Sequence, residues 1–251
     1  MDFSSIPVYV ISVKSFTERQ SSIEKQAKAF GFTPEFIFQF DSDNLLADDR
    51  ARVSERLPSK TASCALKHFE AQKRLLESNS DFALVIEDDV LFFDTFLERI
   101  DEVLMRLRVL DPGWLVFLGG ADDSFPKEAL RLTDNELIEH PLSTAEAYFV
   151  DREGCKLRLD YLRKNRILKP ADHQLKMLDE ILGIQQFWLA KPLCTQGSIT
   201  GQFRTSIDSS RARHSGLYLQ IRFAWRRFVK QFFPRAWFRC SRKIVSLRKL
   251  F

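Results

Sequence analysis

Three consecutive carboxylates, Glu87, Asp88 and Asp89, follow the apolar run 82–86 in the middle of the chain. Carboxylates this close repel one another and raise each other's pKa unless a cation or hydrogen-bond donors compensate. Mg²⁺ and Mn²⁺ bind carboxylate oxygens and bridge them to phosphate oxygens. The triplet therefore indicates a metal-dependent phosphate site, with Glu87 and Asp89 as metal ligands. A solvated turn whose acids cap the next helix is the alternative.

Three further polar residues stand where they could contact a nucleotide. Arg19 lies near the start of a predicted helix and could meet a phosphate together with free backbone amides, unless it is a solvated helix arginine. Asp41 follows a predicted strand and could accept hydrogen bonds from a ribose or a base, unless it caps a turn. His68 lies among apolar residues of a predicted helix, where a lone histidine is more often a buried core residue.

The elements that must position these groups alternate between strands and helices. Apolar, partly β-branched runs predict strands at 8–11, 36–40, 82–86, 114–118 and 147–150. Helical spacing predicts helices at 15–30, 62–77, 96–107, 152–164 and 171–182, the first opened by a capping box of Ser15 and Glu18. The alternation indicates an α/β fold with a mainly parallel sheet flanked by helices. Ligands of such sheets bind beyond the carboxyl ends of the strands, where the acidic triplet lies.

The C-terminal part of the chain differs from the rest in charge. Residues 209–251 hold 12 of the 38 Lys and Arg residues and no Asp or Glu, which leaves 26 basic and all 34 acidic residues in 1–208. We therefore expect a catalytic domain over residues 1–208 and a basic tail over residues 209–251.

Apolar and aromatic residues of this tail recur every three to four positions from Leu217 to Phe232, and Pro234 is expected to break the helix. An aromatic face beside a basic face suits the surface of an anionic membrane. A helix packed on the catalytic domain is the alternative. Nucleic acid is not expected as a partner, because the aromatic residues form an apolar face rather than a stacking surface.

The cysteines and the apolar runs bear on location. Cys64, Cys155, Cys194 and Cys240 are scattered singly, without zinc-ligand spacing or a disulfide framework, which favours a reducing compartment. No run approaches the roughly 20 apolar residues of a membrane span, and the first residues lack the features of a signal peptide. We expect a cytoplasmic protein that is peripheral on the inner face of the cytoplasmic membrane.

Five segments, in this order, resemble the motifs of glycosyltransferase family 25. They are Val8–Ser12 with Ser15 and Thr17–Arg19, then Ser63–His68, Ala83–Val90, Ala147–Val150 and Pro170–His173. The chain departs from the family's motifs at three positions, with Gln20 where a second arginine is common, Lys67 in place of a small hydroxyl residue and Glu146 in place of a histidine. These departures bear on the choice of sugar rather than on the reaction.

The resemblance implies a GT-A-like fold and metal-assisted transfer of a hexose, with galactose the first candidate, from a UDP-sugar. The acceptor would be lipopolysaccharide, lipooligosaccharide or a related lipid-linked oligosaccharide, and the cofactor Mn²⁺ or Mg²⁺. Gln196, Ser198 and Arg204 lie in a late polar loop that could close over the diphosphate, unless it is a plain surface loop. The predicted donor-binding residues are Ile11, Ser12, Arg19, Asp41, His68, Asp88, Gln196 and Ser198.

Transfer with inversion requires a base that takes the proton of the acceptor hydroxyl as it attacks the anomeric carbon. Asp172, in the Pro170–His173 segment, is the first candidate, and an N-cap role is its structural alternative. Glu146 is the rival base, and the sequence does not choose between them.

Two other functions fit the acidic triplet. A nucleotidyltransferase would use the same acids to bind metal and would release pyrophosphate. A membrane or nucleic-acid adaptor with a structural triplet would bind its partner regardless of Mn²⁺ and sugar nucleotides.

Overall fold

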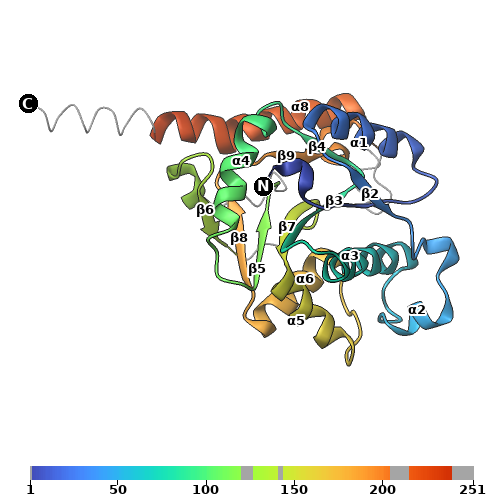
Figure 1. Ribbon diagram of the computed structural model, residues 1–251. Coiled ribbons are helices and arrows are strands. Elements are labelled where there is room, and N and C mark those ends of the chain that lie inside the picture. The colour runs from blue at the N-terminus through green and yellow to red at the C-terminus, as the bar shows by residue number, and fades with distance from the viewer. Residues whose placement is uncertain (1, 120–126, 141–143, 204–214, 239–251) are drawn as a thin grey trace, which may run out of the picture.

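The structure is a computed structural model that describes residues 2–119, 127–140, 144–203 and 215–238. It is an α/β fold around a seven-stranded sheet of order β2-β1-β3-β7-β5-β8-β6, with β4 and β9 paired separately (Figure 1). The strands are β1 Val8–Ile11, β2 Pro34–Ile37, β3 Phe82–Glu87, β4 Val90–Phe92, β5 Trp114–Phe117, β6 Leu137–Glu139, β7 Ala147–Asp151, β8 Gln185–Leu189 and β9 Cys194–Gln196.

The prediction of a mainly parallel sheet is confirmed, with two exceptions in strand direction. Strands β2, β1, β3, β5 and β8 run the same way, whereas β7 is antiparallel to both β3 and β5, and β6 is antiparallel to β8. A strand buried on both faces is apolar throughout in either direction. The apolar run of β7 therefore predicts a central strand without revealing its direction.

Helices cover both faces of the sheet. Figure 1 shows α3, α5 and α6 on one side and α1, α4 and α8 on the other. The helices are α1 Thr17–Phe30, α2 Ala47–Ala51, α3 Ser59–Glu77, α4 Phe96–Leu107, α5 Arg152–Leu162, α6 Ala171–Leu182, α7 Gly197–Thr200 and α8 Gly216–Arg227.

Two local predictions at the N-terminal end are wrong. Helix α1 begins at Thr17, with Phe16 at the N-cap and no side-chain cap, so Ser15 and Glu18 form no capping box. The second strand covers Pro34–Ile37 rather than 36–40, because Phe40 adopts a left-handed conformation with φ of 65°. Such a conformation ends a strand and is uncommon for a residue other than glycine.

Buried aliphatic residues of β1 and β3 form the base on which the site stands. Val10, Leu84, Val85 and Ile86 are fully inaccessible to solvent. Burial of each such side chain contributes about 1.5–3 kcal/mol. The carboxyl ends of these two strands are therefore rigid supports for the polar residues that follow.

The C-terminal helix continues past Pro234, contrary to the predicted break. Residues Phe228–Phe232 form a π-helical turn in which the N–H of Phe233 bonds to the carbonyl of Phe228, and helix resumes as far as residue 238. A wider turn just before a proline relieves the clash between its ring and the preceding turn. Residues 239–251 of the predicted tail lie outside the described part of the chain.

One face of this helix packs on the rest of the protein. Leu219 is buried, the guanidinium of Arg227 lies 4.0 Å from the centre of the Phe93 ring, and Arg235 donates to the carbonyl of Ala190. Other apolar residues are exposed, namely Leu217, Ile221, Trp225, Phe228, Phe232, Phe233 and Trp237. The helix is thus docked on one side and presents an aromatic surface on the other.

Candidate functional site

The acidic triplet begins at the carboxyl end of β3. Glu87 is the last residue of β3 and lies beside Ile11, the last residue of β1, and the N–H of Asp88 donates to the carbonyl of Ile11 at 3.0 Å. The triplet, Ile11 and Ser12 therefore meet at one edge of the sheet, as the predicted topology requires.

Asp88 is held from two sides. The Ser12 hydroxyl donates to Asp88 Oδ2 at 2.8 Å, and Arg19 Nη1 donates to Asp88 Oδ1 at 2.8 Å. Burial raises the pKa of Asp88, and the charge and hydrogen bonds of Arg19 and Ser12 only partly oppose it. Asp88 thus anchors Arg19 and the end of β1.

Glu87 is surrounded by three side chains from two distant segments. His68 Nε2 lies 3.6 Å and Cys64 Sγ lies 4.0 Å from Glu87 Oε1, while Gln196 Nε2 donates to Glu87 Oε2 at 3.1 Å. Burial acts to raise the pKa of Glu87, but His68 and Gln196 outweigh it, so the pKa lies below its usual value. His68 and Gln196 therefore favour the ionised form of Glu87.

Asp89 is buried where β4 pairs with β9. The N–H of Gly197 donates to the carbonyl of Asp89 at 2.6 Å, and a Cβ on Gly197 would lie 2.4 Å from the Phe203 ring, so only glycine fits there. Burial first, and then the Glu87 charge, raise the pKa of Asp89 to about 6, although Ser198 hydrogen-bonds to it. Its Oδ1 atom is buried and has no hydrogen-bond partner among the described residues.

Asp41 and Lys67 form a buried pair next to Ser12. Lys67 donates to Asp41 Oδ1 and to the carbonyl of Ser12, and the N–H of Lys14 donates to Asp41 Oδ2 at 3.2 Å. Both carboxylate oxygens of Asp41 are thus engaged within the protein. Lys67, a departure from the family's motif, supplies the cation that fixes the loop after β1.

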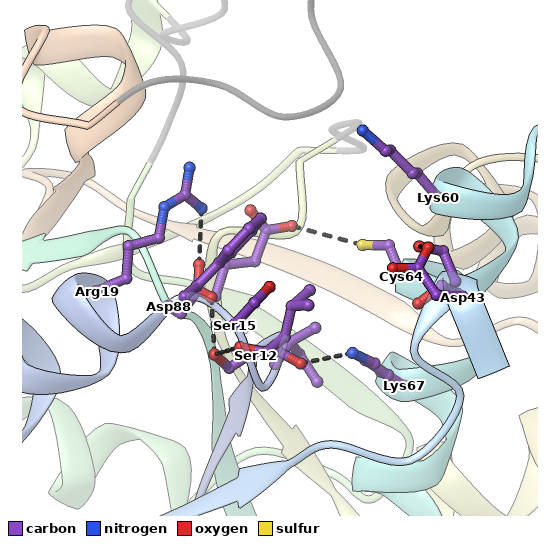
Figure 2. Close-up of a pocket in the computed structure, with 14 residues that line it drawn as sticks. Ser12, Ser15, Arg19, Asp43, Lys60, Cys64, Lys67 and Asp88 are labelled. Atoms are coloured by element: carbon purple, nitrogen blue, oxygen red, sulfur yellow. Dashed lines mark hydrogen bonds and ion pairs between the residues drawn. The ribbon is translucent and has the colours of Figure 1, made fainter.

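A pocket of about 300 Å³ opens beside these groups. Figure 2 shows Arg19 of α1 on one side and Lys60, Cys64 and Lys67 of α3 on the other, with Asp88 and Ser12 between them. The lining residues are Ile11, Ser12, Val13, Ser15, Phe16, Arg19, Ser42, Asp43, Lys60, Ser63, Cys64, Lys67, Glu87 and Asp88.

Sequence reasoning had missed several of these lining residues. Ser15 and Phe16 belong to the turn before α1, Asp43 to the 3₁₀ turn Ser42–Asn44, and Lys60 to the first turn of α3. Phe16, Asp43 and Lys60 belong to no motif of the sequence, and Ser15 was considered only as a motif and cap residue. Cys64 and His68, by contrast, are one helical turn apart and share a helix face, a spacing that differs from the usual zinc-ligand patterns.

The two candidate bases are separated from the pocket lining. Glu146 is buried against Gly119, where a Cβ would lie 2.6 Å from Glu146 Oε1, and burial raises its pKa to about 8. Asp172 lies in the first turn of α6 with about a third of its side chain exposed, and Pro170 rather than Asp172 is the N-cap. The Asp172 charge acts on both Glu146 and Cys64.

Of the predicted site residues, the structure brings most together. Ile11, Ser12, Arg19, Glu87 and Asp88 line the pocket. His68, Asp89, Gln196 and Ser198 lie directly behind or beside the triplet. Asp41 is engaged by Lys67, and Arg204 lies outside the described residues.

The triplet offers carboxylate oxygens, the ligands that a hard divalent cation prefers. Asp88 is already paired with Arg19, whereas Asp89 keeps a buried oxygen without a partner among the described residues and Glu87 faces the pocket. Among the described residues, the buried carboxylates of the triplet are compatible with a metal ligand set at Glu87 and Asp89.

Comparison with known proteins shows a similarity to a family of glycosyltransferases over the N-terminal part of the chain. Residues 5–116 match the model of glycosyltransferase family 25, described as an LPS biosynthesis protein, which confirms the resemblance that the motifs indicate. No curated protein matches the chain. Among solved structures, the galactosyltransferase LgtC in complex with donor and acceptor sugar analogs aligns over 73% of each chain, with 10% identity and a TM-score of 0.42.

Proposed function

We propose that this protein transfers a hexose, with galactose the first candidate, from a UDP-sugar to a lipopolysaccharide or lipooligosaccharide acceptor, with metal assistance and inversion at the anomeric carbon. The observation that carries the proposal is the acidic triplet at the carboxyl ends of β1 and β3, beside a pocket with cationic walls. The description of family 25 as LPS biosynthesis proteins supports the acceptor class.

The donor diphosphate would lie in the pocket between α1 and α3. Arg19 and Lys60 both line it and can offer charged donors to phosphate oxygens. Glu87 and Asp89 would hold Mn²⁺ or Mg²⁺, which when bound neutralises charge on the departing diphosphate. Asp88 contributes indirectly, because it fixes the guanidinium of Arg19 at the pocket wall.

Asp172 is the better of the two candidate bases. It is partly exposed, as a group that meets an acceptor hydroxyl must be, whereas Glu146 is 2% exposed. A pKa of about 8 keeps Glu146 protonated at neutral pH, and a protonated carboxyl cannot accept the hydroxyl proton.

A thermal-shift screen of sugar nucleotides with and without Mn²⁺ tests the proposal. A ligand specific for the folded state raises stability by about 2.7 kcal/mol at one hundred times its Kd. We expect the largest rise in Tm with a UDP-hexose plus Mn²⁺, and release of UDP once acceptor is added. Pyrophosphate as the product would point to a nucleotidyltransferase, and equal shifts with and without Mn²⁺ would argue against a metal at the triplet.

The exposed face of the C-terminal helix supports a second part of the proposal, namely that this face rests on an anionic membrane while the opposite face stays packed on the catalytic domain. Trp225, Phe228 and Trp237 are more than half exposed, and the segment 215–238 contains no acidic residue. Aromatic residues and cations together suit the headgroup region of such a membrane. No helix among the described residues is long and apolar enough to span a bilayer.

Vesicle flotation tests the membrane contact. The double variant Trp225→Ser/Trp237→Ser should bind phosphatidylglycerol vesicles several-fold more weakly than the wild type, and wild-type binding should weaken as salt rises. The matched control is Met105→Ser/Val109→Ser, which changes two exposed apolar residues elsewhere. Equal loss in both variants, or none in either, would place the contact elsewhere.

A further inference from the structure

We propose that Cys64, His68 and Glu87 form a binding site for a soft divalent transition-metal ion such as Zn²⁺. The site shares only Glu87 with the Mg²⁺ or Mn²⁺ site proposed above. It does not depend on the transferase reaction, because it follows from the positions of three side chains.

The spacing of the three ligand atoms suits zinc. Cys64 Sγ, His68 Nε2 and a carboxylate oxygen of Glu87 all lie within 4.8 Å of one another. Two of the separations are 3.6 Å from nitrogen to oxygen and 4.0 Å from sulfur to oxygen. Ligand atoms of a tetrahedral zinc ion lie about 3.3–3.8 Å apart, given bonds of about 2.0–2.3 Å. A small movement of the Cys64 side chain would complete the geometry.

The buried Nε2 atom of His68 also indicates a ligand, independently of the spacing. The residue is fully inaccessible to solvent, and its Nε2 atom makes no hydrogen bond among the described residues, with Glu87 Oε1 just beyond hydrogen-bond distance at 3.6 Å. Its Nδ1 atom lies 3.0 Å from the Tyr148 hydroxyl. In the metal-free protein a proton on Nε2 would face Glu87; metal binding would require the tautomer in which Nδ1 carries the proton and donates to Tyr148, which leaves the Nε2 lone pair to the metal. A partner of this kind orients ligating histidines in most metal sites.

The thiol explains why the site should select a soft metal. Cys64 offers a sulfur ligand 4.0 Å from the Glu87 carboxylate, and soft metal ions such as Zn²⁺ bind thiolates well. Binding of hydrated Zn²⁺ would form bonds to sulfur, nitrogen and oxygen, release water ligands and release the thiol proton to solvent. Mg²⁺ and Ca²⁺ prefer oxygen ligands and gain little from a thiolate.

The site would keep an open coordination position. Cys64 and Glu87 both line the pocket, so the fourth position of a zinc ion faces the space where water or a bound molecule can enter. If the proposed function is right, Zn²⁺ would also inhibit sugar transfer, because it engages the Glu87 carboxylate that the hard cation needs.

Cobalt spectroscopy on the full chain tests the site without any assay of activity. Metal-free protein titrated with Co²⁺ should develop a thiolate-to-cobalt charge-transfer band with one equivalent, and Zn²⁺ should displace it. Cys64→Ser should lose the band, whereas Cys155→Ser, which changes a second free cysteine that is buried, should keep it. Tyr148→Phe should weaken metal binding about 10-fold or more, through the lost partner of His68.

A second measurement covers the case in which Cys64→Ser does not fold. Alkylation of the wild type with iodoacetamide, followed by mass spectrometry of each cysteine peptide, should show that Zn²⁺ protects Cys64 and Mg²⁺ does not. No thiolate band in the wild type, a band that persists in Cys64→Ser, or equal alkylation of Cys64 with and without Zn²⁺ would each overturn the proposal. Such a result would leave the transferase proposal intact.

Discussion

The Arg158–Asp179 pair and the acidic triplet are both buried groups of charges, and they differ in how far positive charge offsets negative charge. Arg158 Nε donates to Asp179 Oδ1 at 2.6 Å, Gln186 Nε2 donates to Asp179 Oδ2 at 2.6 Å, and one cation faces one anion in a closed core. The triplet places three consecutive carboxylates at the edge of the sheet, two of which, Glu87 and Asp88, line a pocket, and Arg19 pairs with Asp88. Uncompensated buried charge costs stability and is retained where a ligand compensates it. The pair is therefore expected to serve the fold, and the triplet is proposed to serve a ligand.

The largest expected effect is a loss of sugar transfer in the variant Asp89→Asn, which removes one carboxylate of the triplet. Loss of a metal-binding charge should lower transfer on the order of 10³-fold. Stability above pH 6 should be unchanged or higher, because ionisation of a carboxyl whose pKa is raised to about 6 opposes folding there. Steady-state kinetics and thermal unfolding at pH 8 check both expectations. Asp94→Asn, an exposed acid five residues further on, is the control, and full activity of Asp89→Asn would contradict a metal role.

Asp179→Ala, in the Arg158–Asp179 pair, should lower stability and leave sugar transfer unchanged. Removing one partner of a buried ion pair strands the other charge and costs about 3–5 kcal/mol of unfolding free energy. Denaturant unfolding measures it, and turnover per folded molecule should be retained. The double variant Arg158→Met/Asp179→Leu should recover much of the loss, because it removes both charges. A loss of stability below 1 kcal/mol in Asp179→Ala would show that water reaches Arg158.

Asp172→Asn should lower kcat about 10²-fold with little change in donor affinity, as expected when a general base is lost. Glu180→Gln, an exposed acid on the same helix, is the control. Single-turnover kinetics with a donor titration separates the two quantities. If donor affinity collapses instead, Asp172 binds the donor and Glu146 becomes the candidate base.

The smallest effect concerns the pH dependence of stability through Glu146. Its folded-state pKa of about 8 lies above the ordinary value of 4.5, so the group stabilises the fold fully below pH 4.5 and this contribution is lost as pH rises through 8. Between pH 6 and pH 8 the wild type should lose about 2 kcal/mol more than Glu146→Gln. If the unfolding free energies of the wild type and Glu146→Gln change equally between pH 6 and pH 8, Glu146 is ionised in the folded protein.

Much of the architecture was predictable from local patterns. Apolar runs and helical spacing give most of the elements, because burial on one face or on both leaves a period in the sequence. The acids at 87–89 could be assigned to a sheet edge, since ligands of open α/β sheets gather at the carboxyl ends of strands. Direction escaped prediction at β7, as did the left-handed Phe40 and the unbroken helix at Pro234, because packing rather than local preference decides them.

By itself, the sequence determined the fold class, the acidic triplet at the end of a buried strand and the basic, aromatic character of the C-terminus. Only the tertiary structure decided which residues surround each acid. The β4–β9 pairing brings Gln196 to Glu87 across 109 positions, and α3 brings Cys64 and His68 to the same carboxylate. Contacts between segments so far apart leave no period in the sequence, because they depend on how the sheet and the helices pack together.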